Sequence, residues 1–319
     1  MSSIILKQDL FKEVLLRPAE KFDTICVVSG FATPAMVAHH LEAVKKDYKK
    51  EDIRVNLIIG MTPLCGISEP NHENFKKLAR DIPDFKCSYI NQTSLPIHTK
   101  LYTWLKNGEP RAAFLSSANY TLSAFSKHQD EVATECDPVE AFKYYSSKII
   151  HSLYCTLDEA NDLVLEREAH VEELLDAEHT LVETDGESVQ LPLFSERDKK
   201  MHSAGAGLNW GQGRAGRTGN EAYIPIPSKI AKSEFFPRRG NHFSVLTEDG
   251  IPFVCAVTQD GNKAIDTPNN NSELGEYLRR KLGVRLGQGY LVELADLDRY
   301  GSRYVKFTKI NEEEYYMEF

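Results

Sequence analysis

The first half of the chain alternates short apolar runs with stretches rich in good helix formers. Thr24–Gly30 and Arg54–Gly60 are mostly apolar, which predicts buried strands. Pro34–Tyr48 and His72–Arg80 follow them and predict helices. Three further strands are predicted at Phe85–Ile90, Pro96–Trp104 and Arg111–Asn119. This alternation predicts an α/β layer fold.

After residue 205 the pattern changes to short strand-like runs separated by turn residues. The predicted strands are Ala222–Ile226, His242–Leu246, Pro252–Thr258, Gly289–Glu293 and Tyr304–Lys309. Only Glu273–Lys281 has a clear helical pattern. This half of the chain is therefore predicted to be mostly β, in the manner of a small barrel.

Residues 138–180 connect the two halves and have helical spacing, with Pro138 at their start. From Thr184 to Ser203 the chain carries Gly, Ser, Pro and mixed charges, which is typical of a linker. We therefore expect a first domain at residues 1–185, a linker at 186–204 and a second domain at 205–319.

Composition excludes several classes of protein. With 41% hydrophobic and 27% charged residues, the 319-residue chain resembles neither collagen, a coiled coil nor a disordered protein. It has no apolar stretch that predicts a membrane span, and charges interrupt Met1–Glu13 too early for a signal peptide. Its six cysteines are scattered, which argues against structural zinc and favours a reducing, cytoplasmic setting.

The net charge of −9 does not decide the partner, because it is concentrated in one segment. Residues 157–188 contain 12 acidic residues and a single base, Arg167. The rest of the chain is therefore close to neutral, and local basic patches that bind nucleic acid remain compatible with the composition.

Two short polar pairs in the first half suggest phosphodiester chemistry. On the first predicted strand, His98 and Lys100 share a face. On the next strand, Ser117 and Asn119 share a face in the same way. A hairpin through residues 107–110 would bring both pairs to one side of the sheet. An imidazole can attack phosphorus while lysine and neutral donors bind the non-bridging oxygens, and this chemistry needs no metal.

An acid shortly after these pairs, Glu131 or Asp130, would fix the tautomer of the imidazole, with the spacing favouring Glu131. Each pair also has an ordinary explanation. His-x-Lys is common by chance, and Ser-x-Asn after a strand is typical of a turn or a helix cap. Their occurrence together, in this order, favours a catalytic site.

His98-x-Lys100 with Ser117-x-Asn119 and a later acid resembles the signature of the phospholipase D superfamily, in its nuclease branch. Leu105 stands where the full signature has an Asp, which weakens the phospholipid assignment more than the nuclease one. The resemblance implies a mixed sheet flanked by helices and a metal-independent phosphodiesterase that uses a covalent phosphohistidine and no cofactor. Because the family uses two His-x-Lys motifs per site and this chain has one, it also implies a homodimer through the N-terminal domain, with one shared site.

Two polar arms in the second half are candidates for reading DNA. The first, residues 208–227, places polar and aromatic side chains among glycines, and the second spans residues 259–271. Such segments can lie against a major groove while Arg, Asn and Gln contact base edges. Flexible surface loops are the alternative explanation. The candidate DNA-binding residues are Asn209, Trp210, Gln212, Arg214, Arg217, Asn220, Gln259, Asp260, Asn262, Lys263, Thr267, Asn269 and, toward phosphate, Arg279.

The run from Asn209 to Pro225, together with Lys263–Pro268 and Leu274–Val284, resembles the C-terminal domain of NgoFVII-type restriction endonucleases, which is similar to the plant B3 DNA-binding pseudobarrel. Both halves thus resemble one family over nearly the whole chain. The resemblance implies a type II restriction endonuclease that cuts double-stranded DNA at or near a specific short sequence and has a cognate DNA methyltransferase as its genetic partner.

Two other functions remain open from the sequence. One is a sequence-specific DNA-binding regulator whose phospholipase-type domain only dimerises, against which the intact His98, Lys100 and Asn119 argue. The other is a phospholipase or a nonspecific nuclease, which would leave the two arms unexplained. The acidic segment 157–188 suggests a connector that repels DNA until the recognition domains engage, although a solvated helix face explains it equally well.

Overall fold

The computed structural model describes residues 5–125, 130–165 and 187–319. The chain divides into two compact units, residues 1–182 and 183–319, and each has its own sheet. None of the described helices is long and apolar enough to cross a membrane.

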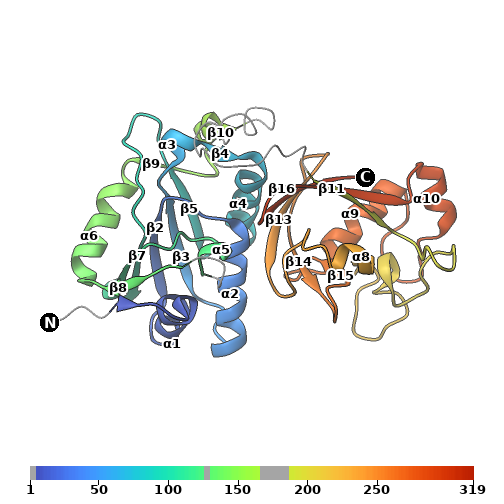
Figure 1. Cartoon of the computed structure of the whole chain (residues 1–319), viewed down its shortest axis with the longest axis horizontal. Coiled ribbons are helices and arrows are strands. Elements are labelled where there is room, and N and C mark those ends of the chain that lie inside the picture. The colour runs from blue at the N-terminus through green and yellow to red at the C-terminus, as the bar shows by residue number, and fades with distance from the viewer. Residues whose placement is uncertain (1–4, 126–129, 166–186) are drawn as a thin grey trace. The chain divides into compact units, whose positions relative to one another are not determined.

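An eight-stranded mixed sheet forms the centre of the first unit, in the order β1-β8-β7-β6-β2-β3-β5-β9 (Figure 1). Strands β2, β3 and β5 run parallel, and the other neighbours are antiparallel. The strands are β1 (Ile5–Leu6), β2 (Thr24–Ser29), β3 (Arg54–Ile59), β5 (Phe85–Ile90), β6 (Leu101–Lys106), β7 (Glu109–Ser116), β8 (Ala133–Glu135) and β9 (Ser152–Tyr154). The predicted α/β fold is confirmed.

Helices cover both faces of this sheet, with α6 on one side and α2 and α4 on the other (Figure 1). Under α6, Cys26 and Val28 of β2 pack with Ala141 and Tyr145 of the helix. The remaining elements are short. The helical and minor elements are η1 (Phe11–Leu16), α1 (Arg17–Lys21), α2 (Pro34–Tyr48), α3 (Thr62–Cys65), α4 (Glu69–Asp81), α5 (Leu122–Phe125), α6 (Pro138–Ile149) and η2 (Asp158–Leu163), with β4 (Ile67–Ser68) paired to β10 (Val164–Leu165).

Several chain segments meet at the edge of the sheet where the central strands begin or end. The parallel strands β2 and β3 end there, and β6 begins there because it runs antiparallel to β2. Strand β7 ends there and β8 begins there, since Leu101 pairs with Leu115 and Ser116 pairs with Ala133. We call this edge, formed by residues 29–31, 60–62, 97–100, 117–120 and 130–132, the site edge.

Two predicted elements of the first unit differ most from the structure at their ends. The strand predicted at Pro96–Trp104 begins only at Leu101, because the N–H of Ile97 bonds to the carbonyl of Gly60 and Pro96 has no N–H. The helix predicted over residues 138–180 ends at Ile149, and the chain then returns as β9 to pair with β5. Most of the acidic segment, residues 166–186, lies outside the described residues.

The second unit is built on a seven-stranded sheet that curls toward a closed barrel, in the order β11-β16-β17-β13-β14-β15-β12. Its core is rich in aromatic residues, including Phe243, Phe307 and Tyr315. The elements are β11 (Ser188–Pro192), η3 (Gly207–Asn209), β12 (Ile224–Pro225), α8 (Ser228–Ala231), β13 (His242–Thr247), β14 (Pro252–Thr258), β15 (Ala264–Asp266), α9 (Ser272–Leu282), α10 (Leu294–Tyr300), β16 (Tyr304–Asn311) and β17 (Glu314–Glu318). The predicted mostly β second half, with its helix at Glu273–Lys281, is confirmed.

Two predictions for this unit need correction. Ser188–Pro192 lies in the predicted linker but forms β11, which pairs with β16 and buries Leu191 in the core. Its alternating apolar residues, Val189 and Leu191, are flanked by Gly, Ser and Pro, which are typical of a linker. Gly289–Glu293, predicted as a strand, is a loop whose backbone bonds to side chains of the first arm instead of a neighbouring strand.

Candidate active site

The site edge brings the two predicted polar pairs together. His98 and Lys100 lie in the loop immediately before β6, and Ser117 and Asn119 lie in the loop immediately after β7. Strands β6 and β7 form the predicted hairpin, so the two loops are neighbours. The pairs therefore meet as expected, although they occupy loops and not the strand faces assumed from the sequence.

The ammonium group of Lys100 contacts the imidazole of His98. Its Nζ lies 3.2 Å from Nδ1, 3.0 Å from Nε2 and 3.0 Å from the backbone oxygen of His98. Lys100 is buried, with 8% of its surface exposed, whereas His98 is exposed. The side chain of Lys100 thus comes from inside the protein and places a fixed cation beside an accessible imidazole.

This arrangement favours the neutral imidazole. Partial burial and, second to it, the charge of Lys100 lower the pKa of His98 below its ordinary value. Burial also lowers the pKa of Lys100, while the negative charge of Glu131 opposes that shift. A neutral imidazole has a free lone pair, which is the form that a nucleophile requires.

Gly30 separates the imidazole from the amide of Asn119 and was not identified from the sequence. A Cβ atom at this position would lie 2.7 Å from Cδ2 of His98 and 3.3 Å from Oδ1 of Asn119. Because real Cβ atoms do not approach other atoms so closely, only glycine leaves His98 in this position. The only signal in the sequence was a glycine that ends the predicted strand Thr24–Gly30.

Asn119 is held by the end of β2. Its Oδ1 accepts hydrogen bonds from the backbone N–H of Phe31 at 3.1 Å and, more weakly, from Oγ of Ser29 at 3.5 Å. These bonds engage the oxygen and fix the orientation of the amide, so the NH₂ group is the part that can act as a donor. The ring of Phe31 also packs edge-on toward His98, with centroids 6.0 Å apart.

Buried hydroxyl groups fix the loop that carries Ser117 and Asn119. Tyr102 donates a hydrogen bond to the carbonyl of Ala118 at 2.7 Å, and the N–H of Tyr120 donates to Ser29 at 2.9 Å. The Tyr120 hydroxyl lies 2.7 Å from Nδ1 of the buried His40. The loop is therefore preorganised by groups that the substrate cannot reach.

Glu131 contacts Ser117 and lies near Lys100. Oγ of Ser117 donates to the carboxylate of Glu131 and accepts from the N–H of Val132 at 3.0 Å. Within the described part of a single chain, this carboxylate has no hydrogen bond to the imidazole of His98. The sequence predicts such a bond. Asp130, the other candidate, is exposed at the same edge.

Two further features concern the chemistry of the first unit. Leu105, at the position where the superfamily signature has an Asp, is buried under α6 in β6. No group of three or more His, Cys, Asp or Glu side chains that could hold a metal ion occurs in residues 5–125, 130–165 or 187–319.

The structure divides the candidate DNA-binding residues of the second unit into exposed and buried ones. Trp210, Arg217, Asn220 and Asn262 are partly exposed. Both ends of the Asn220 amide nevertheless form hydrogen bonds within the unit. Its oxygen accepts from the N–H of Gly287, and its NH₂ group donates to the carboxylate of Glu276. The exposed candidates are Arg214, Gln259, Asp260, Lys263 and Asn269.

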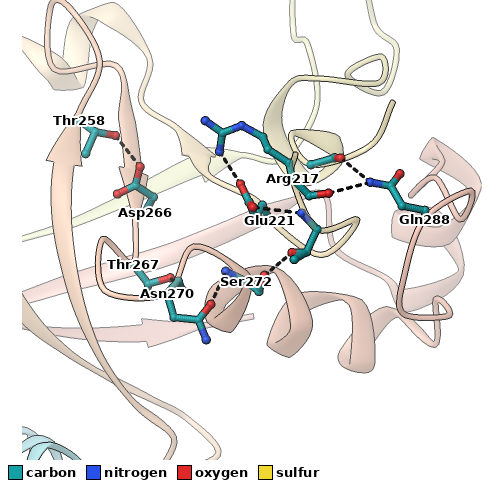
Figure 2. A network of polar contacts seen from close by, with 10 residues as sticks. Arg217, Glu221, Thr258, Asp266, Thr267, Asn270, Ser272 and Gln288 are labelled. Atoms are coloured by element: carbon teal, nitrogen blue, oxygen red, sulfur yellow. Dashed lines mark hydrogen bonds and ion pairs between the residues drawn. The ribbon is translucent and has the colours of Figure 1, made fainter. Parts of the chain in front are cut away.

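Four of the candidates are buried, which corrects their predicted role. Gln212 donates to the carbonyls of Gly219 and Gly287 and accepts from the N–H of Gly289. The hydroxyl of Thr267 donates to the carbonyl of Asn270 at 2.7 Å (Figure 2). Asn209 and Arg279 are buried as well. These side chains support the backbone of the arms and have no surface to offer to DNA.

Arg279 is a buried cation whose acceptors are backbone and amide oxygens. Its guanidinium donates to the carbonyls of Tyr290 at 2.6 Å and Leu208 at 2.9 Å and to Oδ1 of Asn209 at 3.3 Å. Burial lowers its pKa. Arg279 therefore joins the first arm to the loop before α10, and the predicted phosphate contact is wrong.

Replacing Asn209 by alanine is expected to destabilise the second unit by about 3 kcal/mol, because the change leaves several buried polar groups without hydrogen-bond partners. Asn209 donates to the carbonyls of His202 and Val292 and accepts from the N–H of Val292. Denaturant unfolding followed by circular dichroism measures the effect. The exposed Arg214→Ala variant is the control, with an expected change within about 0.5 kcal/mol. Weakened DNA binding with an unchanged unfolding curve would contradict this assignment.

Searches of solved structures find likenesses to the first unit. NucT from Helicobacter pylori is 14% identical, with a TM-score of 0.34, over 48% of this chain and 98% of that protein. The phospholipase D family member Nuc from Salmonella typhimurium is also 14% identical, with a TM-score of 0.35, over 48% of this chain and 97% of that protein. No curated protein matches the chain.

Family comparison covers both units. Residues 8–162 match the N-terminal phospholipase D domain of the NgoFVII restriction endonuclease, and residues 184–311 match the C-terminal B3-like DNA-binding domain of the same enzyme. The first unit is thus a phospholipase D-like nuclease domain, and the second is a B3-like DNA-binding domain. The chain belongs to the NgoFVII restriction endonuclease family.

Proposed function

We propose that this protein cuts double-stranded DNA at or near a specific short sequence, without a metal ion, through a covalent intermediate on His98. The observation that carries the proposal is the imidazole of His98, which is accessible and lies beside the fixed ammonium of Lys100. Its lowered pKa favours the neutral form. A nuclease domain and a DNA-binding domain in one chain support DNA as the substrate. A methyltransferase that protects the host's own copies of the sequence is the expected genetic partner.

In the first step, a neutral ring nitrogen of His98 attacks phosphorus, and the bond from phosphorus to one sugar oxygen breaks. Lys100 and the amide NH₂ of Asn119 stabilise the extra negative charge on the non-bridging oxygens. The departing sugar oxygen needs a proton, and water must later be activated to release the phosphohistidine. Lys100 serves as a fixed positive charge in this proposal and does not transfer the proton. A second imidazole is therefore the appropriate acid for the departing oxygen and the appropriate base for the water.

A second copy of the chain is proposed to supply that imidazole as its own His98. The site edge is flanked by apolar side chains that are unusually exposed for a single chain: Phe31, Leu64, Leu95, Leu115 and Val132. Leu95, three residues before His98, is 85% exposed. Covering these residues with a second copy would place the two histidines at a two-fold axis, where one shared site cuts the two DNA strands in turn.

The test is digestion of a mapped plasmid in excess EDTA. We expect discrete fragments, whose ends give the recognition sequence and the cut position. A smear would indicate a nonspecific nuclease and would remove the proposed role of the second domain. Absence of cleavage in EDTA, with cleavage restored by added magnesium, would contradict the metal-free mechanism.

The cleavage rate is expected to peak below pH 6.5, the ordinary pKa of histidine. The mechanism needs one neutral and one protonated imidazole in the shared site, and this combination is most populated when the pH equals their pKa. Because burial and Lys100 lower the pKa of His98 in both copies, the optimum moves to lower pH. Single-turnover rates across the titration range of histidine measure it. A rate that keeps rising into alkaline pH would contradict the mechanism.

A further inference from the structure

Arg217 in the first arm is held from two sides by other side chains. Its guanidinium carbon lies 4.0 Å from the centre of the Trp210 ring, and Nη1 forms an ion pair with the carboxylate of Glu221. One third of the Arg217 side chain remains exposed. The guanidinium is therefore fixed in position and still open to a partner.

The backbone beneath Arg217 is fixed as well (Figure 2). Gln288 donates to the carbonyl of Arg217 at 3.2 Å, and the N–H of Thr218 donates to Glu221 at 3.1 Å. The hydroxyls of Thr218 and Ser272 lie 2.6 Å apart and join this arm to the first residue of α9. The side chain and its support thus form one preorganised unit, which reduces the entropy lost on binding.

Arg214, three residues away, is held differently. It lies in a turn between Gly213 and Gly216, both with positive φ, and its side chain is exposed. Among the described residues, no carboxylate forms an ion pair with it. The two arginines of the same arm therefore differ in the feature that matters for recognition, a fixed orientation.

We infer that Arg217 reads a guanine in the major groove, and that Glu221 and Trp210 are the positioning residues that aim it. With Nη1 engaged by Glu221, the Nη2 and Nε donors keep the forked geometry that matches O6 and N7 of guanine. Stacking on Trp210 keeps the fork in one plane. This inference rests on the proposed function, because it assumes that the second domain recognises a DNA sequence.

The test is selection of bound duplexes from a randomised pool, using the full-length protein with His98→Ala so that bound DNA is not cut. Without a further change, the selected sequences should contain a G·C pair at one fixed position. Arg217→Lys keeps the charge but removes the fork, so the preference for guanine at that position should fall about 10- to 100-fold while the other positions keep theirs. Glu221→Gln should weaken the same preference to a smaller extent.

The same lysine substitution at Arg238 is the matched control, because Arg238 is an exposed arginine outside both arms that also pairs with a glutamate four residues away. The selected sequence should not change. Thermal unfolding of each variant checks that the second unit remains folded. An unchanged sequence preference in Arg217→Lys, or an equal loss at every position, would overturn the inference while leaving sequence-specific binding intact. If the protein without a substitution in the arm selects no common sequence, both the proposed function and this inference are overturned.

Discussion

Replacing His98 by alanine is expected to reduce DNA cleavage by at least about 10⁴-fold, since the change removes the proposed nucleophile of both copies together with the proposed acid and base. Binding to DNA is expected to persist, because the second unit has its own core and does not depend on His98. Gel-based cleavage and electrophoretic binding assays measure the two properties separately. His151→Ala is the matched control, since His151 is an exposed histidine in the turn between α6 and β9.

Mixed dimers distinguish one shared site from two independent ones. Equal amounts of chains with and without His98→Ala, carrying different tags, are mixed by coexpression or joint refolding so that dimers form at random. If both imidazoles are required, activity should fall to about one quarter of that of an equal amount of unmutated protein, because only unmutated pairs can cut. A fall to about one half would mean that each chain cuts on its own, and the proposed shared site would be wrong.

Gly30→Ala is expected to lower the cleavage rate about 100-fold, although alanine carries no new chemistry. The added Cβ would lie 2.7 Å from the His98 ring and 3.3 Å from the Asn119 amide oxygen, so the imidazole must move. The backbone at Gly30 does not have a positive φ, so the cost falls on the position of His98 and not on the backbone. Single-turnover cleavage at saturating protein isolates this effect on the chemical step.

Two controls show whether Gly30→Ala acts through the site. The melting temperature of the first unit should change little, because the ring of His98 is exposed and can swing toward solvent. The affinity for DNA should be unchanged. Full activity in Gly30→Ala would mean that His98 need not occupy its observed position, and would remove Gly30 from the site.

Much of the first unit could be predicted from the sequence because its pattern is local. Phe85–Ile90 and Pro34–Tyr48 were predicted with the bounds that the structure has. The meeting of His98 and Lys100 with Ser117 and Asn119 followed from a hairpin with a recognisable turn. The late start of β6 could not be predicted, since it depends on a bond between Ile97 and Gly60, 37 residues earlier in the chain.

The residues of the second unit show where sequence reasoning fails. Asn209, Gln212 and Arg279 have the side chains expected of DNA readers, but their partners are backbone groups as distant in sequence as Val292 and Gly287. A polar residue in a glycine-rich run looks the same whether it faces solvent or supports a loop. Only burial separates the two roles, and burial depends on tertiary contacts that no local pattern contains.

Each unit contains one of the two tryptophans of the chain. Trp104 is buried in β6 and donates to the carbonyl of Val14, so its fluorescence should be blue-shifted and should change only when the first unit unfolds. Trp210 is partly exposed beneath the guanidinium of Arg217, so its emission should respond when DNA binds beside this stacked pair. With Trp104→Phe, the protein would report the engagement of its first arm by intrinsic fluorescence, without an added label.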